Sequence, residues 1–306
     1  MNFEKEFERR QAAAEAVIAA YLPKEEGCAK TVIEAMNYSV RSGGKRLRPI
    51  LMQAAYEAAG GEETAAEPFM AAIEMIHSYS LVHDDLPEMD NDELRRGRPT
   101  THVQYGQAMA VLAGDGLLNL AFETAMKAFD YANEKETRCG IRALRILAEK
   151  AGIRGMVGGQ CLDVEAEEKG LSLTQDELLF VYANKTSALL EAALGCGAVL
   201  AGADDATVAE FFVAGYELGI AFQLQDDLLD IEGSTEELGK PVGSDERNGK
   251  KTYVSFLGRE EAKKEQKRLS VSAAERIGKL AVKDGKQKEA AEFLKELILS
   301  LVSRRK

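Results

Sequence analysis

Residues 83–92 read His-Asp-Asp-Leu-Pro-Glu-Met-Asp-Asn-Asp, and six carboxylates fall within residues 84–93. The segment before them, Phe69 to Val82, is apolar with few helix breakers, so it predicts one buried helix. Pro87 cannot continue that helix and disfavours the α conformation at the residue before it. The acids are therefore expected to emerge from the end of a core helix.

These acids are candidate metal ligands. Asp84 and Asp85 are expected on the last helical turn, with Asp90 brought back by the loop that follows. Charge at the end of a core helix is costly unless something compensates it. Hard oxygen ligands at this density suit Mg²⁺, which binds carboxylates together with phosphate oxygens. Taken alone, the stretch is also compatible with a solvated acidic loop.

A second acidic stretch, Phe-Gln-Leu-Gln-Asp-Asp-Leu-Leu-Asp at residues 222–230, ends another apolar segment. Asp226 and Asp230 are four residues apart and hence neighbours on one helical face, where like charges repel unless a cation lies between them. Two such clusters can face each other across a bundle and hold a diphosphate through several metal ions. This favours a metal site over two unrelated surface loops.

Composition narrows the class of protein. The chain has 306 residues, six prolines, no tryptophan and a formal net charge of −12, which argues against non-specific nucleic-acid binding. The four scattered cysteines form no metal-binding pattern and are expected to be small buried residues in a reducing compartment. Neither a signal peptide nor an apolar run long enough to span a membrane is present, so a cytoplasmic protein is expected.

Apolar periodicity and breakers predict one all-α domain over residues 1–306, without strands. The expected helices are residues 2–21, 28–42, 47–59, 62–85, 104–131, 134–150, 153–168, 172–200, 206–231, 258–281 and 285–303. The Gly-rich residues 233–251 are expected to form a long loop, a length typical of lids and binding loops.

The sequence Gly-Gly-Lys-Arg-Leu-Arg-Pro at residues 43–49 places three cations at a helix start. A helix N-terminus disfavours cations, so helix formation alone does not explain them. A bound anion would, because backbone N–H groups and basic side chains would converge on it.

These motifs together resemble those of the trans-polyprenyl diphosphate synthases, and the chain is most similar to the bacterial farnesyl diphosphate synthases. The matching motifs are GGKRxRP at residues 43–49, DDxxxxD at 84–90, GGQxxD at 158–163 and DDxxD at 226–230. The resemblance implies an isoprenoid-synthase-type helical bundle around a deep central cavity, and a homodimer. It also implies Mg²⁺-assisted 1'-4 condensation of isopentenyl diphosphate with dimethylallyl or geranyl diphosphate, with three Mg²⁺ ions when both substrates are bound.

The resemblance assigns site residues. The metal ligands would be Asp84, Asp90, Asp226 and Asp230. The diphosphates would be bound by Gly44, Lys45, Arg48, His77, Arg95, Arg96, Lys240 and Lys250. The developing allylic cation would be stabilised by Lys185, Thr186 and Gln223.

Several of these residues have plainer interpretations. His77 could be an ordinary core histidine, and Arg95 and Arg96 could simply neutralise the neighbouring acids. Gln160 and Asp163 of the GGQxxD motif could line the cavity or serve packing. The C-terminal residues 304–306, Arg-Arg-Lys, could be inert or could fold over the isopentenyl diphosphate site.

Product length is expected to depend on cavity depth. Tyr79 lies five residues before Asp84, about 7.5 Å along the helix, where an aromatic side chain would stop the growing prenyl chain. Together with Ser80 it is the candidate chain-length determinant, and the resemblance favours the C15 product. The alternatives are a geranylgeranyl or geranyl diphosphate synthase, or a non-catalytic subunit of a heteromeric synthase, although such subunits typically lose an aspartate motif. A ferritin-like di-metal protein needs two Glu-x-x-His pairs, and only Glu74 and His77 form one.

Overall fold

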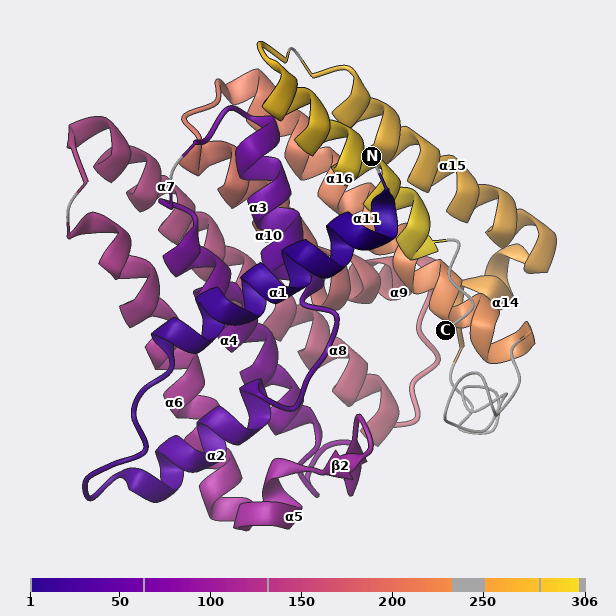
Figure 1. Cartoon of the computed structure of the whole chain (residues 1–306). Coiled ribbons are helices and arrows are strands. Elements are labelled where there is room, and N and C mark those ends of the chain that lie inside the picture. The colour runs from indigo at the N-terminus through magenta and orange to yellow at the C-terminus, as the bar shows by residue number, and fades with distance from the viewer. Residues whose placement is uncertain (1, 63, 131, 233–250, 281, 303–306) are drawn as a thin grey trace.

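The computed structural model describes residues 2–62, 64–130, 132–232, 251–280 and 282–302 as a bundle of helices (Figure 1). The helices of the first half are α1 (Phe3–Tyr21), α2 (Lys30–Val40), α3 (Leu47–Ala58), α4 (Glu67–Asp84), α5 (Thr101–Tyr105), α6 (Gln107–Met126), the 3₁₀ turn η1 (Lys127–Phe129) and α7 (Glu134–Ala151). The second half holds α8 (Met156–Glu168), α9 (Gln175–Val181), the π-helical segment η2 (Tyr182–Ser187), α10 (Ala188–Leu200), α11 (Asp205–Glu232), α14 (Tyr253–Leu257), α15 (Arg259–Gly278) and α16 (Gly285–Val302). The predicted all-α fold is confirmed.

Two helices form the inside of the bundle. Residues 188–199 of α10 are all buried, and α10 packs against α3, α7 and α11 near the centre of Figure 1. α4 is buried along nearly its whole length and packs against α6, α3 and α1. Because both helices are apolar around their circumference, each requires neighbours on every side. This arrangement places the C-terminal end of α4, with its acids, inside the molecule.

The end of α4 matches the expected geometry. Asp84 is the last helical residue, and the backbone N–H of Asp90 donates to the carbonyl oxygen of Asp84 at 2.8 Å. The loop therefore turns back on the helix end, as predicted from Pro87.

The expectation of no strands was wrong in one place. β1 (Leu94–Arg95) and β2 (Arg98–Pro99) form a short antiparallel hairpin at the end of the bundle where α5 also lies (Figure 1). Its two central residues, Arg96 and Gly97, have φ of +54° and +75°, the backbone of the turn that joins two-residue hairpins. Two-residue strands leave no alternation in the sequence to detect. The hairpin sets the directions of Arg95 and Arg96.

Helix boundaries agree with prediction within a few residues, with three exceptions. The predicted helix 104–131 is divided at Gly106 into α5 and α6, and α6 continues into η1. A further helix, α14, precedes α15 and is separated from it by Gly258. The predicted helix 172–200 starts at Gln175 and contains the π-helical turn η2.

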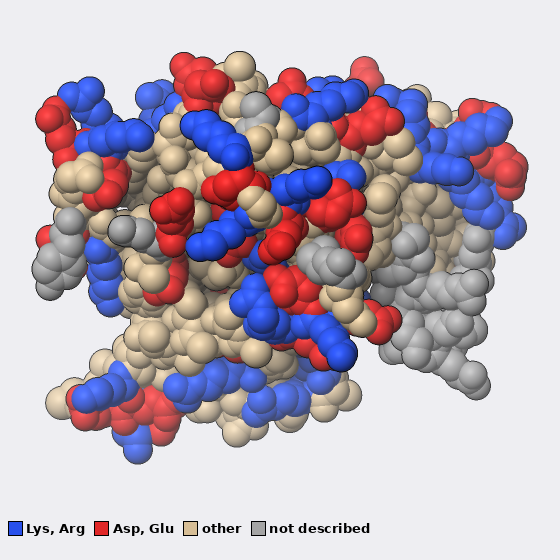
Figure 2. Space-filling view, turned by 45° about the horizontal axis from the view of Figure 1, so that its top comes forward, with Lys and Arg blue, Asp and Glu red and all other residues tan. Residues whose placement is uncertain are grey.

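Cys28 and Cys161 are exposed and Cys139 is half-buried, so burial of all four cysteines was wrong; only Cys196 is buried. On the face shown in Figure 2, acidic and basic side chains are interspersed without one continuous basic patch. In the part of the chain that the structure describes, no helix is long and apolar enough to cross a membrane.

Candidate active site

A cavity of about 740 Å³ lies between α4, α8 and η2. Its polar and charged lining comes from Arg48, His77, Tyr79, Ser80, His83, Asp84, Gln160, Cys161, Glu165, Glu168, Lys185 and Thr186. Its apolar lining comes from Leu81, Met89, Met156, Val157 and Val164. Seven of the predicted site residues thus share one cavity: Arg48, His77, Tyr79, Ser80, Asp84, Lys185 and Thr186.

The first aspartate motif contains two different carboxylates. Asp84 lines the cavity, and burial, opposed by the nearby Lys185, raises its pKa to about 6. Gln160 of α8 donates its side-chain amide to Asp84 Oδ1 at 2.9 Å. Asp85 is buried and faces the hairpin, where Arg95 Nε lies 2.8 and 2.9 Å from its two oxygens. Asp84 is therefore the carboxylate of this pair that the cavity exposes, and Arg95 neutralises Asp85.

Two of the three residues predicted to stabilise the allylic cation, Lys185 and Thr186, lie on η2, and the third, Gln223, lies on α11. Lys185 Nζ donates to Asp163 Oδ2 at 2.6 Å, and Thr186 Oγ1 donates to Gln223 Oε1 of α11 at 3.1 Å. A π-helical turn re-aims side chains relative to an α-helix and is frequent at functional sites. The Asp163 carboxylate as a partner of Lys185 was not predicted from the sequence.

Close packing of α8 against η2 depends on Gly159. A Cβ at this residue would lie 2.2 Å from the backbone nitrogen of Lys185. The glycines of GGQxxD thus allow the approach that was expected, and Gln160 and Asp163 reach the site from the same helix.

The second aspartate motif lies on α11, one helical turn beyond Gln223. Asp227 is buried and accepts hydrogen bonds from the Tyr182 hydroxyl at 2.6 Å and from the backbone N–H of Tyr253 at 3.2 Å. Asp226 is half-buried and Asp230 is buried. Contacts through Gln160 on α8 and through Thr186 and Gln223 connect this helix with Asp84.

Among the described residues, no three His, Cys, Asp or Glu side chains converge as closely as the ligands of one metal ion. The four predicted ligands occupy the end of α4, the loop after it and α11. Asp90 is exposed. Metal binding by these four residues therefore stays a prediction.

Basic side chains gather around His77. Arg48 Nε is buried and has no hydrogen-bond partner within the described ranges. Burial, and then the charges of Arg48 and Arg96, hold the pKa of His77 well below its ordinary value, so its imidazole is neutral. A Cβ at Gly44 would lie 2.7 Å from the Arg96 guanidinium, so only glycine admits Arg96 there. A buried guanidinium N–H without a partner among the described residues, beside a second arginine, is a suitable environment for an anion.

Sequence reasoning treated Arg46 as one of three cations at this helix start, but the structure accounts for it separately. Arg46 is buried, and its guanidinium forms ion pairs with Glu15 at 2.7 Å and Glu74 at 2.7 Å. Lys45, by contrast, is exposed. The contacts of Glu15 on α1 and Glu74 on α4 could not be found from spacing, because 31 and 28 residues separate them from Arg46.

The proposed chain-length residues are adjacent on the cavity wall. Tyr79 is only 6% exposed, and its ring meets the His83 ring edge-on at 5.8 Å. Burial, and then the charge of Asp84, raise the pKa of the Tyr79 phenol to about 12. Ser80 donates to the His77 carbonyl oxygen at 3.0 Å. His83 and the α8 side chains other than Gln160 were not predicted as cavity residues, although His83 directly precedes Asp84 in sequence.

Three sequence predictions lie outside the described residues. These are the two proposed lid lysines, Lys240 and Lys250, and the basic residues 304–306.

The chain is similar to known proteins over nearly its whole length. A model of the polyprenyl synthetase family matches residues 29–293. The chain is 42% identical over 298 residues to the farnesyl diphosphate synthase of Geobacillus stearothermophilus, which covers 97% of both chains. It is 44% identical to the geranylgeranyl diphosphate synthase of Cyanophora paradoxa, covering 80% of this chain and 81% of the relative. The crystal structure of the geranylgeranyl pyrophosphate synthetase from Pyrococcus horikoshii superimposes with a TM-score of 0.86 at 32% identity, over 99% of this chain and 100% of the other. The chain therefore belongs to the polyprenyl synthetase family.

Proposed function

We propose that this chain condenses isopentenyl diphosphate with dimethylallyl or geranyl diphosphate to give (2E,6E)-farnesyl diphosphate. The observation that carries the proposal is one cavity that combines two kinds of diphosphate-binding groups with an apolar wall. The lining includes Asp84 and Lys185, here called the acidic side, Arg48 and His77, here called the basic side, and Tyr79 of α4. Family membership supplies the reaction class.

The allylic diphosphate is assigned to the acidic side. Burial and the nearby Asp90 carboxylate both disfavour the charged form of Asp84 and so raise its pKa. A bound divalent cation would offset this cost, so Asp84 is a suitable ligand. Mg²⁺ bound by the ligand set Asp84, Asp90, Asp226 and Asp230 would act as a Lewis acid on the diphosphate leaving group, with three ions when both substrates are present. Lys185 contributes a fixed positive charge beside Asp84. Arg95, now paired with Asp85, is proposed to contact this same diphosphate.

The isopentenyl diphosphate is assigned to the basic side, where Lys45, Arg48, His77 and Arg96 bind it without metal. Arg48 Nε already lacks a partner among the described side chains. A neutral His77 ring carries one N–H, which it can donate to a diphosphate oxygen. Gly44 contributes by leaving room for Arg96.

Ionisation of the allylic C–O bond produces a carbocation that the protein must hold away from water. The Thr186 hydroxyl donates a hydrogen bond to Gln223, so the lone pairs of the Thr186 oxygen can face positive charge in the cavity. Together with Gln223 they stabilise positive charge by preorganised dipoles. The double bond of isopentenyl diphosphate attacks C1, and the leaving pyrophosphate takes the proton that completes the new double bond.

The C15 product is proposed from the position of Tyr79, which is packed against His83 in the cavity wall, with Ser80 beside it. A farnesyl and a geranylgeranyl diphosphate synthase have nearly equal sequence identity to this chain, 42% and 44%, so product length has to be determined by experiment. We also propose a cytoplasmic homodimer, with Lys240 and Lys250 reaching the allylic diphosphate.

Product analysis tests the proposal. Purified protein would be incubated with Mg²⁺, labelled isopentenyl diphosphate and dimethylallyl or geranyl diphosphate, and the dephosphorylated alcohols sized by chromatography. A C15 alcohol that disappears with EDTA is expected. A C20 or C10 alcohol would retain the reaction and correct the product. The absence of any Mg²⁺-dependent product would refute the enzyme assignment and favour a non-catalytic subunit.

A further inference from the structure

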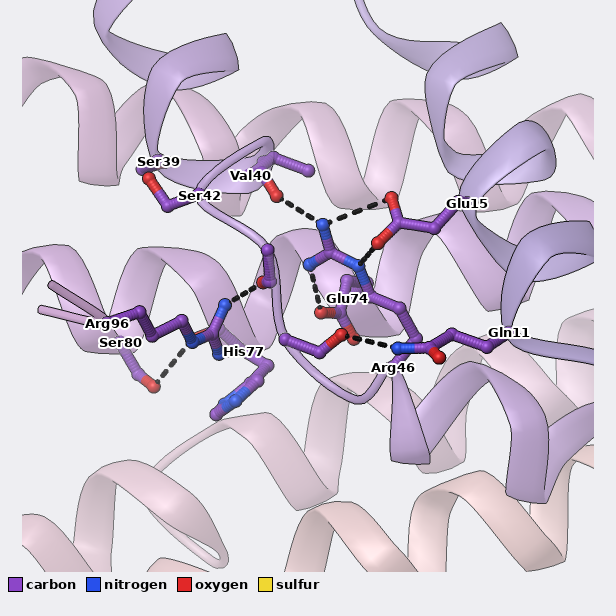
Figure 3. A network of polar contacts seen from close by, with 12 residues as sticks. Gln11, Glu15, Ser39, Val40, Ser42, Arg46, Glu74, His77, Ser80 and Arg96 are labelled. Atoms are coloured by element: carbon purple, nitrogen blue, oxygen red, sulfur yellow. Dashed lines mark hydrogen bonds and ion pairs between the residues drawn. The ribbon is translucent and has the colours of Figure 1, made fainter. Parts of the chain in front are cut away.

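The loop between α2 and α3 is held from outside the cavity. Two side chains from elsewhere in the chain donate to its carbonyl oxygens, and the loop residue Arg46 donates to the last residue of α2 (Figure 3). Gln11 Nε2 donates to Gly44 at 2.9 Å, Arg96 donates to Gly43, and Arg46 Nη2 donates to Val40 at 2.6 Å. The conformation of the loop, which carries Lys45, is thus fixed by contacts on both of its sides.

Arg46 is the centre of these contacts. Its backbone is left-handed, with φ of +51°, and its side chain turns away from the cavity into a buried space between α1 and α4. Figure 3 shows the loop with Arg46, Glu15 and Glu74 on one side and His77 and Arg96 on the other. A non-glycine residue in this conformation needs surrounding contacts to maintain it. The two carboxylates provide these contacts and compensate the buried charge.

α1 contributes two of the contacts. Gln11 and Glu15 are four residues apart, hence on one face of α1, and this face meets the back of the loop. Neither side chain lines the cavity. α1 lies before residues 29–293, the part of the chain that the family model matches.

We propose that Gln11 and Glu15 are positioning residues for isopentenyl diphosphate, acting through Arg46 and the Gly44 carbonyl on Lys45 and Arg48. The inference rests on the proposed assignment of that substrate to the basic side. A loop already fixed in its binding conformation loses less conformational entropy when the diphosphate binds. Loosening it should therefore weaken binding of this substrate and leave the allylic site, on α4, α8 and η2, unchanged.

Steady-state kinetics of the full-length chain test the inference. For Glu15→Gln and for Gln11→Ala, KM for isopentenyl diphosphate should rise about fivefold to tenfold, as for loss of one hydrogen bond to a charged or buried group. KM for the allylic diphosphate and kcat should change less than about twofold, within the range of measurement in such assays. Gln11→Ala removes only a neutral hydrogen bond and keeps the test available if Glu15→Gln does not fold.

Glu57→Gln is the matched control. It removes the negative charge of one of the two carboxylates that pair with the buried Arg10 of α1: Arg10 Nη2 lies 2.6 Å from Glu57 Oε2, and Arg10 Nε lies 2.8 Å from Glu6 Oε1. The contact with Glu57 joins α1 to α3 away from the loop. Glu57→Gln should lower the melting temperature as Glu15→Gln does, with KM for isopentenyl diphosphate unchanged.

Arg48→Met distinguishes the assignment of isopentenyl diphosphate to the basic side from the positioning role of Gln11 and Glu15. If Arg48→Met raises KM for isopentenyl diphosphate while Glu15→Gln and Gln11→Ala do not, the positioning role is refuted and the substrate assignment stands. If Glu57→Gln raises this KM as much as Glu15→Gln, α1 acts only through general stability and the inference is overturned. If Arg48→Met leaves it unchanged, both the assignment and the inference fail.

Discussion

Gln160 on α8 donates its side-chain amide to Asp84 at the end of α4, across 2.9 Å and 76 residues of sequence. One oxygen of Asp84 is thereby engaged by a neutral donor, which leaves the other for a cation. The amide oxygen of Gln160, Oε1, is buried and has no hydrogen-bond partner in the described part of the chain. An amide held this way fixes the carboxylate without neutralising it.

Gln160→Met should therefore reduce activity through Asp84. The substitution keeps side-chain length and removes the donor, so we expect kcat/KM for the allylic diphosphate to fall about tenfold, the value of a hydrogen bond to a charged group. Kinetics at several Mg²⁺ concentrations measure the effect. Cys161→Ser, at the neighbouring exposed cavity residue, should leave kcat/KM nearly unchanged. Equal values for Gln160→Met and the parent chain would show that Gln160 only packs.

The sequence predicted the parts of the site that local chemistry determines. The end of α4 was found because an apolar helix, a proline and a run of acids are adjacent in sequence. The basic motif before α3 was found because cations at a helix start contradict the helix dipole. In each case, the signal is continuous in sequence and lies at the terminus of one helix.

Contacts between distant segments could not be predicted this way. Arg46 was grouped with Lys45 and Arg48, but its ion pairs with Glu15 and Glu74 depend on how α1 and α4 cross. The ion pair of Lys185 with Asp163 was not predicted, because it depends on how η2 packs against α8. The hairpin at β1 and β2 was missed because two residues cannot show a periodicity.

Asp84 should make the ligand-free protein less stable at neutral pH. Its folded pKa of about 6 lies above the ordinary 3.8, so the folded state holds a proton that the unfolded state has lost between these values. Stability therefore falls as pH rises from about 4 to 6 and stays low above that. Asp84→Asn removes this loss, and the free energy of unfolding in EDTA should rise by about 2 to 3 kcal/mol at pH 7.5.

Urea denaturation at pH 4.5 and 7.5 would measure this difference. The advantage of Asp84→Asn should shrink towards the lower pH, and the variant should lose Mg²⁺-dependent activity. Glu88→Gln, at an exposed carboxylate of the same loop, should show no pH-dependent gain. A gain of equal size at both pH values would contradict the assignment of the effect to desolvation of Asp84.

Tyr79→Ala should lengthen the product. The ring is buried in the cavity wall against His83, so its removal opens space towards the core. We expect C20 or longer alcohols in place of C15, and a loss of about 3 kcal/mol in the free energy of unfolding, typical of truncating a buried aromatic residue. Tyr79→Phe preserves the ring and should preserve C15. An unchanged product from Tyr79→Ala would place the stop for the chain elsewhere, with the α8 side chains as the next candidates.

The ion pair of Lys185 and Asp163 allows structure and chemistry to be separated. Asp163 is 7% exposed, so Lys185→Met leaves a buried carboxylate without its cation and should cost about 1 to 3 kcal/mol of stability, a range reduced because Lys185 itself is partly exposed. The double variant Lys185→Met/Asp163→Asn removes both charges and should regain most of that stability. Activity should not return, because the positive charge beside the allylic diphosphate is still missing; we expect a loss in kcat of about 100-fold in both variants. Thermal unfolding and kcat, measured on the same samples, give the two answers independently. Recovery of kcat in the double variant would mean that Lys185 serves only to neutralise Asp163.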